Sequence, residues 1–398
     1  MNARLKTLIW ADLDAAARTA ALARPAVTLN PDIDERVAEI IAAVRTDGDA
    51  ALLDLTSRFD GVDLTSLRVD DAEVAAAESE IGADARAAMA IAIANVETFH
   101  AAQMADPVRV ETAPGVVCER VTRPINAVGL YVPAGSAPLP STAIMLAIPA
   151  RLAACPTRVM CTPPRPDGRA DPAVVVAAKM CGIDAIYKIG GAQAVAAMAY
   201  GTESVPKVDK IFGPGNAWVT AAKTAVATDS AGAALDMPAG PSEVMVVADG
   251  STNPTFVALD LLSQAEHGPD SQAILVCTDA GYAGAVEDAI GAALPELSRR
   301  DIIEQSLSHG RCFIVDDIAA GLEVANRYAA EHLIIQVQNA RQYVDLINNA
   351  GSVFLGPWTP ESVGDYCSGT NHVLPTYGFA RNYSGLAVKD FQKQLTFQ

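Results

Sequence analysis

The sequence predicts an α/β protein made of two units, each a parallel sheet with helices on both faces. The chain has 398 residues, 51% of them hydrophobic, which is enough for a sizeable core and for more than one domain. Aromatic residues make up only 5%, so Ala, Val, Leu and Ile must build that core, as in helices packed on parallel strands. From residue 116 onward, short β-rich runs alternate with Ala-rich helical runs, which is typical of right-handed crossovers.

The elements follow in order along the chain. Apolar residues at three- and four-residue spacing predict helices over 33–44, 50–59 and 83–100. A first alternating series of strands and helices covers 127–132, 142–154, 158–162, 173–181, 185–189, 193–200, 210–212 and 217–228. A second series covers 243–247, 256–267, 273–277, 283–294, 312–315, 318–328, 333–336, 340–349 and 352–355. Open parallel sheets bind ligands beyond the carboxyl ends of their strands, so we expect a site in a cleft between the two units.

Composition and charge make several functional classes improbable. The 29 basic and 47 acidic residues give a net charge of −18 without a basic cluster, so we expect no nucleic-acid partner. The 7 cysteines are scattered singly, which argues against a zinc knuckle and favours a reducing compartment. Residues 1–27 lack the apolar core of a signal peptide, and the most apolar window, 143–155, is interrupted by Pro149 and Arg151. We therefore expect a cytoplasmic protein with no membrane segment.

The segment 263–269 places an amide and an imidazole three residues apart, at Gln264 and His267, after the apolar helical run 256–262. Residues at this spacing lie on one helix face, so both can point at one ligand. Gly268 and Pro269 indicate that the helix stops there. The alternative is a histidine placed near a helix C-terminus for its favourable interaction with the helix dipole.

Glycine-rich loops follow three predicted strands, at 133–136, 190–193 and 213–216. Each lets the backbone turn sharply and offers free N–H groups to an anion such as a pyrophosphate. None has the spacing of the G-x-G-x-x-G dinucleotide fingerprint, and one such loop alone is often only a steric requirement. Three in one half of the chain favour a phosphate-bearing cofactor.

Two further segments carry candidate reactive groups. The loop 236–243 is stiffened by two prolines and presents the hydroxyl of Ser242, although a rigid crossover explains it equally well. Glu331 and His332 stand just before the predicted strand 333–336 and are two possible proton acceptors. Neighbouring residues in a regular strand point to opposite faces, so both reach one cleft only if the start of the strand is irregular.

Asp365 and His372 lie in polar, glycine-containing segments, 362–366 and 368–372, which we interpret as loops. Gln264, His267 and Asp365 together form a set of oxygen and nitrogen ligands without thiolates, compatible with Zn²⁺ or Mn²⁺. Glutamine is a poor metal ligand, so a metal site and a site without metal both remain open.

The chain resembles the histidinol dehydrogenases from about residue 30 to its last residue. The matching motifs are long and occur in the family's order: GLYVP at 129–133, GGAQA at 190–194, GTESVPKVDKIFGPGN at 201–216, DMPAGPSE at 236–243, LLSQAEHGPDSQ at 261–272, EHLIIQ at 331–336 and SGTNHVLPT at 368–376.

The resemblance implies oxidation of L-histidinol to L-histidine through the aldehyde, with two NAD, as the last step of histidine biosynthesis. It implies a cytoplasmic homodimer with one zinc ion per subunit. By match of motif, zinc would be bound by Gln264, His267 and Asp365, and NAD by Tyr131, Gln193 and Asn216. The substrate would contact Ser242, Gln264, His267, His332, Asp365 and His372. Glu331 and His332 would be the proton acceptors, with Glu331 activating water in the second oxidation and the pKa of His332 near the working pH.

For the fold, the resemblance implies two side-by-side, incomplete Rossmann-like units with an N-terminal helical arm and a short C-terminal extension. The expected arm is 1–28. The expected first domain is 29–128 plus 243–380, with the metal and catalytic residues, and the expected second domain is 129–242, on the NAD side. Residues 381–398 would begin a C-terminal tail.

The sequence departs from the family pattern in two places. Ala134 replaces the first of two consecutive glycines in the first glycine-rich loop, which matters only if this residue needs a positive φ. Family members continue past 384–398 into a helical piece whose glutamate and histidine reach the partner subunit's site, and we expect that this tail has been cut from the sequence or left out of it rather than that the chain stops naturally. A chain ending at Gln398 is expected to retain zinc weakly and turn over poorly, which metal analysis can measure.

Two alternative functions stay open. One is a related NAD-dependent dehydrogenase that acts on another polar alcohol and keeps Glu331, His332 and the metal residues. The other is a catalytically silent homologue that binds zinc or a nucleotide. NADH formation on L-histidinol and on simple polar alcohols separates the first from the main hypothesis, whereas a silent homologue predicts ligand-induced stabilisation without turnover.

Overall fold

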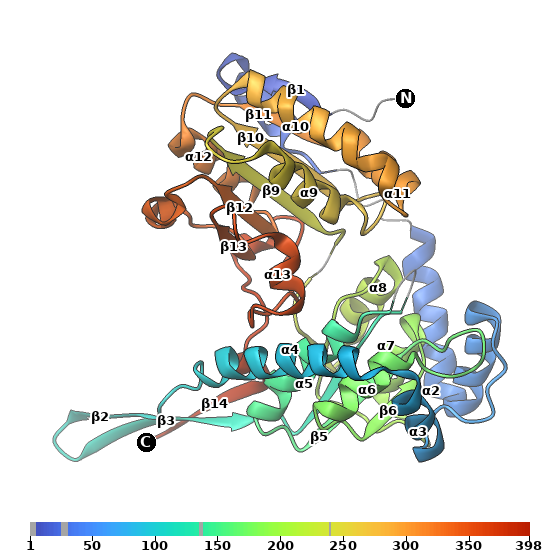
Figure 1. The fold of residues 1–398 in the computed structure, drawn as a ribbon. Helices are drawn as coiled ribbons and strands as arrows, with labels where there is room; N and C mark the ends of the chain where they lie inside the picture. The colour runs from blue at the N-terminus through green and yellow to red at the C-terminus, as the bar shows by residue number, and fades with distance from the viewer. Residues whose placement is uncertain (1–4, 25–30, 135–137, 239) are drawn as a thin grey trace. The chain divides into compact units, whose positions relative to one another are not determined.

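The computed structural model describes residues 5–24, 31–134, 138–238 and 240–398 (Figure 1). The chain forms two compact units. Unit 1 consists of Met1–Thr28, Ala239–Asp365 and Leu374–Gly385, and unit 2 consists of Leu29–Pro238, Tyr366–Val373 and Leu386–Gln398. Each unit is built on a parallel sheet, which confirms the predicted α/β class.

Unit 1 contains a six-stranded sheet with the order β1-β11-β10-β9-β12-β13, and its neighbouring strands are parallel. The strands are β1 (Lys6–Ile9), β9 (Glu243–Ala248), β10 (Gln272–Cys277), β11 (Arg311–Ile314), β12 (His332–Gln336) and β13 (Ser352–Leu355). Strands β9, β10 and β12 are buried at every residue. Such burial requires helices on both faces of the sheet.

The helices of unit 1 meet this requirement (Figure 1). They are α1 (Ala15–Ala21), α9 (Pro254–Ala265), α10 (Ala280–Ala293), α11 (Arg300–Ser308), α12 (Ile318–Tyr328) and α13 (Glu361–Tyr366), with short 3-10 helices η1 (Trp10–Asp12), η2 (Leu294–Glu296), η3 (Ala340–Leu346) and η4 (Phe379–Arg381).

Alternate residues of β9 belong to two cores. Val244 packs with Leu261 of α9 and Val286 of α10, whereas Met245 packs with Leu322 of α12. The two sheet faces are thus covered by different helices.

Unit 2 contains a five-stranded parallel sheet with the order β6-β5-β4-β7-β8. Its strands are β4 (Ala127–Tyr131), β5 (Thr157–Thr162), β6 (Ala185–Lys188), β7 (Lys210–Phe212) and β8 (Ala234–Leu235). Its helices are α2 (Pro31–Asp60), α3 (Asp71–Glu80), α4 (Ala83–Ala101), α5 (Pro140–Leu152), α6 (Pro172–Met180), α7 (Gly191–Tyr200) and α8 (Ala217–Ala227). Leu130 of β4 packs with α5 and α6, and Tyr131 packs with α7 and α8, so helices cover both faces here too.

Unit 2 also carries an antiparallel sheet that the sequence analysis did not predict. Its order is β14-β3-β2, from β2 (Val108–Ala113), β3 (Val116–Pro124) and the C-terminal β14 (Gln392–Phe397). The short helix η5 (Val388–Phe391) precedes β14, and the ring of Phe391 stacks on Phe212 with 3.9 Å between centroids. Residues 388–397, which the sequence analysis placed in a tail, therefore pack into unit 2.

The predicted domain boundaries differ from this division. They placed 29–128 with 243–380, whereas the described residues 31–128 belong to unit 2. The reason is the packing of α2, whose buried residues Val37 and Leu52 share a core with Val195 of α7 and Val219 of α8. This long-range contact leaves no trace in the local sequence pattern.

The N-terminal segment is also more than a helical arm. Residues Lys6–Ile9 form the edge strand β1 beside β11, and within the described part of the segment, 5–24, only Ala15–Ala21 form an α-helix. Leu5 is buried, and Trp10 packs edge-on against Phe313 with 5.4 Å between ring centroids. The segment is thus an integral part of unit 1.

Two predictions drawn from composition can be compared with the fold. Among the described residues, no helix combines the length and apolarity needed to cross a bilayer. The 7 cysteines are all free thiols. Five are buried, Cys118 is only partly buried and Cys367 is exposed.

Candidate active site

Gln264 and His267 lie at the C-terminal end of α9. The helix ends at Ala265, so Gln264 belongs to its last turn and His267 to the turn that follows. His267 therefore does not share a helix face with Gln264 as predicted, although its backbone N–H donates to the Gln264 carbonyl oxygen at 3.2 Å. Gln264 is fully buried and His267 is exposed.

Glu331 and His332 stand at the start of β12, the strand between β9 and β13. Glu331 precedes the regular strand, and its Oε2 atom lies 3.7 Å from His332 Nδ1. The start of the strand is therefore irregular, as the sequence analysis required for both side chains to reach one site. Both side chains are held by the backbone of Glu243, whose N–H donates to Glu331 Oε2 at 2.8 Å and whose carbonyl oxygen lies 3.1 Å from His332 Nδ1.

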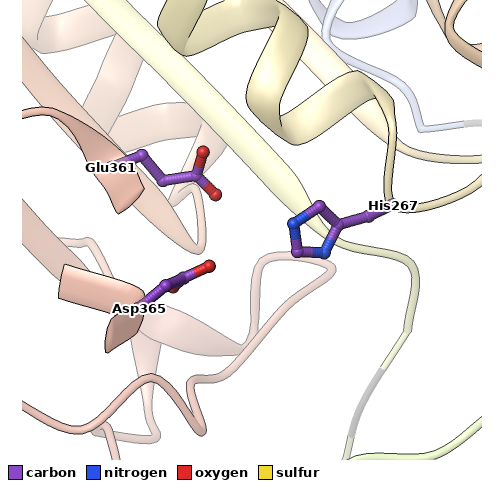
Figure 2. A group of neighbouring side chains, drawn as sticks. All are labelled: His267, Glu361 and Asp365. Atoms are coloured by element: carbon purple, nitrogen blue, oxygen red, sulfur yellow. The ribbon is translucent and has the colours of Figure 1, made fainter. Parts of the chain in front are cut away.

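Helix α13 presents two acidic side chains to His267 (Figure 2). We interpreted 362–366 as a loop, and this was wrong because Asp260 Oδ1 accepts the N–H of Glu361 at 3.1 Å and fixes the start of a helix. Glu361 and Asp365 are four residues apart and so share one face of α13. A ring nitrogen of His267 and one carboxylate oxygen from each acid all lie within 4.8 Å of one another.

Glu361 is a candidate ligand that the sequence analysis missed. The sequence feature that could have identified it is the four-residue spacing to Asp365, which places both acids on one face only if the segment is helical. The side chain is buried and also accepts a hydrogen bond from the Ser263 hydroxyl. Residues from α9 and α13 thus converge on one place in unit 1.

The imidazole of His332 lies at the centre of this cluster. One end of the Gln264 amide is 2.9 Å from Nδ1 and 3.1 Å from Glu361 Oε1. On the other side of the ring, Nε2 lies 3.7 Å from Asp365 Oδ1 and has no hydrogen-bond partner within the described ranges. Three residues selected from the sequence, Gln264, Glu331 and Asp365, therefore meet around the buried ring of a fourth, His332.

Burial and charge shift the pKa values of this cluster. Burial raises the pKa of Glu331 to about 8 and that of Glu361 to about 7. For His332, burial acts to lower the pKa, but the carboxylates of Glu331, Asp365 and Glu361 outweigh it and raise the pKa to about 10. Without a cation these three acids favour the protonated ring, and a His332 pKa near the working pH in the metal-loaded site stays a prediction.

The donor set fits a divalent cation. The ligand atoms of His267, Glu361 and Asp365 are one imidazole nitrogen and carboxylate oxygens, the donors that Zn²⁺ accepts in catalytic sites. Two ligands of one zinc ion lie at most about 4.4 Å apart, since each bond is about 2.0–2.2 Å long. Small side-chain rotations would therefore suffice. A cation would also offset the excess of negative charge around His332.

Replacing Glu361 with glutamine is expected to weaken Zn²⁺ binding by about 10- to 100-fold, the usual effect of losing a group that supports a metal site. Competition with a chromophoric chelator measures this affinity. Glu304→Gln, which removes an acid paired with Arg300 on the exposed side of α11, is the matched control and should leave the affinity unchanged. Equal zinc affinity in both variants would place Glu361 outside the metal site.

The remaining predicted substrate residues belong to different units. Ser242 lies in unit 1, directly before Glu243, and its carbonyl oxygen accepts from the Gln272 N–H at 3.0 Å. His372 lies in unit 2, where its Nε2 atom is 3.2 Å from the Ser141 hydroxyl oxygen. Contact of Ser242 and His372 with a substrate stays a prediction.

The three residues predicted to bind NAD line one cavity of unit 2, with a volume of about 1480 Å³. Tyr131 ends β4, Gln193 lies in the first turn of α7, and Asn216 caps α8 by accepting from the N–H groups of Trp218 and Val219. The cavity therefore lies beyond the carboxyl ends of parallel strands, where this class of sheet binds its ligands. Arg36, Arg58 and Arg165 also line it.

The glycine-rich loops form much of this cavity. Gly191 donates its N–H to the Tyr131 hydroxyl at 3.1 Å, and burial raises the pKa of Tyr131 to about 12. Ala134, which departs from the family pattern, lines the cavity without adopting a positive φ. The rest of that first loop, at 135 and 136, lies outside the described residues.

Gly213→Ala is expected to destabilise unit 2 by about 1–3 kcal/mol or more and to weaken NAD binding. Gly213 has a φ of +124°, and an added Cβ would lie 2.1 Å from the Tyr131 carbonyl oxygen. Its N–H and carbonyl are also held, at 2.8 Å and 3.0 Å, by the buried pair Asp236 and Lys223. Denaturant unfolding and the KM for NAD check this. Gly284→Ala, on an open face of α10, is the control and should be neutral or slightly stabilising.

Comparison with known proteins agrees with the geometry. The family model of histidinol dehydrogenase matches residues 23–398. A histidinol dehydrogenase of Xanthomonas euvesicatoria is 56% identical over 394 residues, which cover 99% of this chain and 91% of that protein. One of Vibrio cholerae is 53% identical and covers 99% of this chain and 90% of that protein. The crystal structure of histidinol dehydrogenase from Elizabethkingia anophelis superposes with a TM-score of 0.95 at 45% identity, covering 99% of this chain and 90% of that chain.

Proposed function

The chain belongs to the histidinol dehydrogenase family, and we propose that it oxidises L-histidinol to L-histidine through L-histidinaldehyde, with two NAD, at the last step of histidine biosynthesis. The observation that carries the proposal is the cluster in unit 1, where Glu331 and His332 lie beside His267 and Asp365. We expect it to act in the cytoplasm as a homodimer.

Gln264, His267 and Asp365 would hold one zinc ion in this cluster, and Glu361 would contribute to the same metal site. When bound, the zinc ion would orient the amine and imidazole of the substrate, while NAD accepts the hydride. Orientation of this kind supplies up to about 7–11 kcal/mol in favourable systems. Because all these ligands come from α9, α13 and the turn after α9, unit 1 alone provides the substrate with a fixed platform.

His332 would accept the proton of the alcohol in the first oxidation. Loss of the hydroxyl proton must accompany departure of the hydride from the same carbinol carbon, or no carbonyl forms. The Nδ1 side of the ring is engaged by Glu243 and Gln264. Its Nε2 atom is therefore the ring nitrogen left to take the proton, once a bound cation offsets the acids that favour the protonated ring.

Glu331 would act in the second oxidation. Water must add to the aldehyde before a second hydride can leave, and its proton needs an acceptor. The Glu331 carboxylate is buried, adjacent to His332, and fixed by the Glu243 N–H at one oxygen, Oε2. Its other oxygen can then face the water. This division of work lets one bound substrate pass through both steps.

For the cofactor we propose NAD in the cavity of unit 2. Tyr131, Gln193 and Asn216 line this cavity, as the family resemblance implies for NAD ligands. The N-terminal ends of α7 and α8 and the three arginines Arg36, Arg58 and Arg165 line the cavity, and their positive charge is suited to a pyrophosphate. The volume of about 1480 Å³ is sufficient for a dinucleotide.

An NADH assay with added Zn²⁺ tests the proposed function. L-histidinol is expected to reduce NAD with a kcat/KM at least about a thousandfold above that for simple polar alcohols, because a site built to hold polar groups rejects substrates that lack them. Comparable rates with another polar alcohol would instead support a relative of different specificity. Thermal stabilisation by zinc or NAD without any turnover would support a silent homologue.

A further inference from the structure

Arg24, which follows α1, inserts its guanidinium into the interior of unit 1. Its Nε and Nη2 atoms donate to the two carboxylate oxygens of Glu243, the latter at 2.9 Å. The Arg24 side chain is only 11% exposed and that of Glu243 is 0% exposed, so water cannot replace either partner. The guanidinium carbon lies 3.9 Å from the ring centroid of Tyr328. Arg24 and Glu243 therefore form a buried, two-pronged ion pair.

The same guanidinium holds the chain that leads into β12. Its Nη2 atom donates to the carbonyl oxygens of Tyr328, at 3.0 Å, and Ala329, at 3.4 Å. Ala329 has a φ of 58°, a left-handed conformation that is strained for a residue with a side chain. Glu331 is only two residues further on. The hydrogen bonds from Arg24 thus hold the backbone turn at Tyr328 and Ala329, and this turn determines where Glu331 and His332 lie.

Glu243 completes the link from the opposite side. Its N–H donates to Glu331 Oε2 at 2.8 Å, and its carbonyl oxygen lies 3.1 Å from His332 Nδ1. Its own carboxylate also accepts the N–H of Tyr377 at 3.2 Å. Both catalytic side chains are therefore anchored on the backbone of one residue, and the side chain of that residue is anchored on Arg24.

We infer that Arg24 and Glu243 are positioning residues for Glu331 and His332. We call this ion pair the clamp: Arg24 holds the turn before β12, Glu243 holds both catalytic side chains from the start of β9, and neither residue touches the substrate. The inference rests on the proposed roles of Glu331 and His332. A buried ion pair is a weak source of stability, since similar apolar residues often replace it without loss. Its role here is to orient the neighbouring residues, because the planar guanidinium of arginine donates its hydrogen bonds in fixed directions in addition to carrying a charge.

Single and double variants test the clamp. Arg24→Met leaves Glu243 buried and unpaired and can prevent folding, so the informative variant is Arg24→Met with Glu243→Gln, which removes both charges together. We expect the double variant to fold but to lose about 10- to 100-fold in kcat, because a misplacement of the order of 1 Å can have effects of this size. The KM values for L-histidinol and NAD should change less than about twofold, since substrate and cofactor contacts stay in place.

Two further measurements separate positioning from mere stability. Asn326→Ala removes three side-chain bonds from α12 to the end of η3 and the loop that follows, to Leu346 O at 2.7 Å, Asn348 N at 2.7 Å and Asn349 N at 3.1 Å. This control should lower the melting temperature and leave kcat unchanged. Guanidinium ion added to Arg24→Ala should restore part of the lost kcat, and the kcat of Arg24→Lys should fall between those of the wild type and the double variant, because lysine keeps the charge but not the fork.

The outcomes are distinct. A folded double variant with wild-type kcat overturns the clamp. The clamp is also overturned if kcat falls only in proportion to the melting temperature, so that Asn326→Ala loses as much kcat as the double variant and guanidinium restores none of the loss in Arg24→Ala. A wild-type protein that does not oxidise L-histidinol would instead contradict the proposed function.

Discussion

Replacing His332 with alanine is expected to lower kcat for both the alcohol and the aldehyde oxidation by about 100- to 10,000-fold, the range for losing a general base. The ring lies at the centre of the unit 1 cluster, within 3.7 Å of Glu331 and Asp365. Gln264 and the Glu243 carbonyl hold its Nδ1 side, so Nε2 is the ring nitrogen left to take the proton. NADH formation from L-histidinol and from L-histidinaldehyde, measured separately, checks both steps.

His309→Ala is the matched control for this variant. His309 lies in the same unit, at the end of α11, and is not part of the cluster. It should keep wild-type activity. A loss below about tenfold in His332→Ala, or a loss confined to one of the two oxidations, would remove His332 from the role of proton acceptor.

Glu331→Gln is expected to stall the aldehyde oxidation by about 100-fold or more while the alcohol oxidation changes less than about tenfold. Glutamine keeps an oxygen that can accept the Glu243 N–H, now 2.8 Å from Glu331 Oε2, so the start of β12 should keep its shape. It cannot take a proton from water. The variant should therefore release L-histidinaldehyde, which an aldehyde-trapping reagent detects.

The control for this variant is Glu323→Gln on the exposed side of α12, which should behave as the wild type. If Glu331→Gln slows both half-reactions equally, the proposed division of work between Glu331 and His332 fails. Equal losses would mean that Glu331 acts mainly on the position or charge of its neighbour.

Much of the secondary structure could be predicted from local patterns. The predicted elements 318–328 and 352–355 agree residue for residue with α12 and β13. Both are bounded by clear signals and their apolar residues have the right period. The prediction of two parallel α/β units followed from the same alternation, and it is confirmed.

Elements that depend on distant partners could not be predicted. Helix α13 contains a glycine, Gly364, and was taken as a loop. In the fold, that glycine lets the helix approach Phe354, whose ring would lie 2.6 Å from an added Cβ, while Asp260 caps the first turn. Strand β14 exists only through pairing with β3, more than 260 residues earlier in the chain. Neither contact has a local signature.

The candidate site shows the same limit. Residue type and motif identified Gln264, His267, Glu331, His332 and Asp365, and the structure brings them together in unit 1. Glu361 and Arg24 were missed. Arg24 stands in an unremarkable N-terminal segment, 219 residues from Glu243, so its importance emerges only from the folded contact.

The central claim is that His332 and Glu331, in one site, carry a small alcohol through two successive oxidations. The most direct test is the number of NADH molecules formed per L-histidinol consumed by the zinc-loaded protein. We predict two, with L-histidine as the product and no free aldehyde. A ratio of one, with aldehyde accumulating in the wild-type protein, would contradict the account.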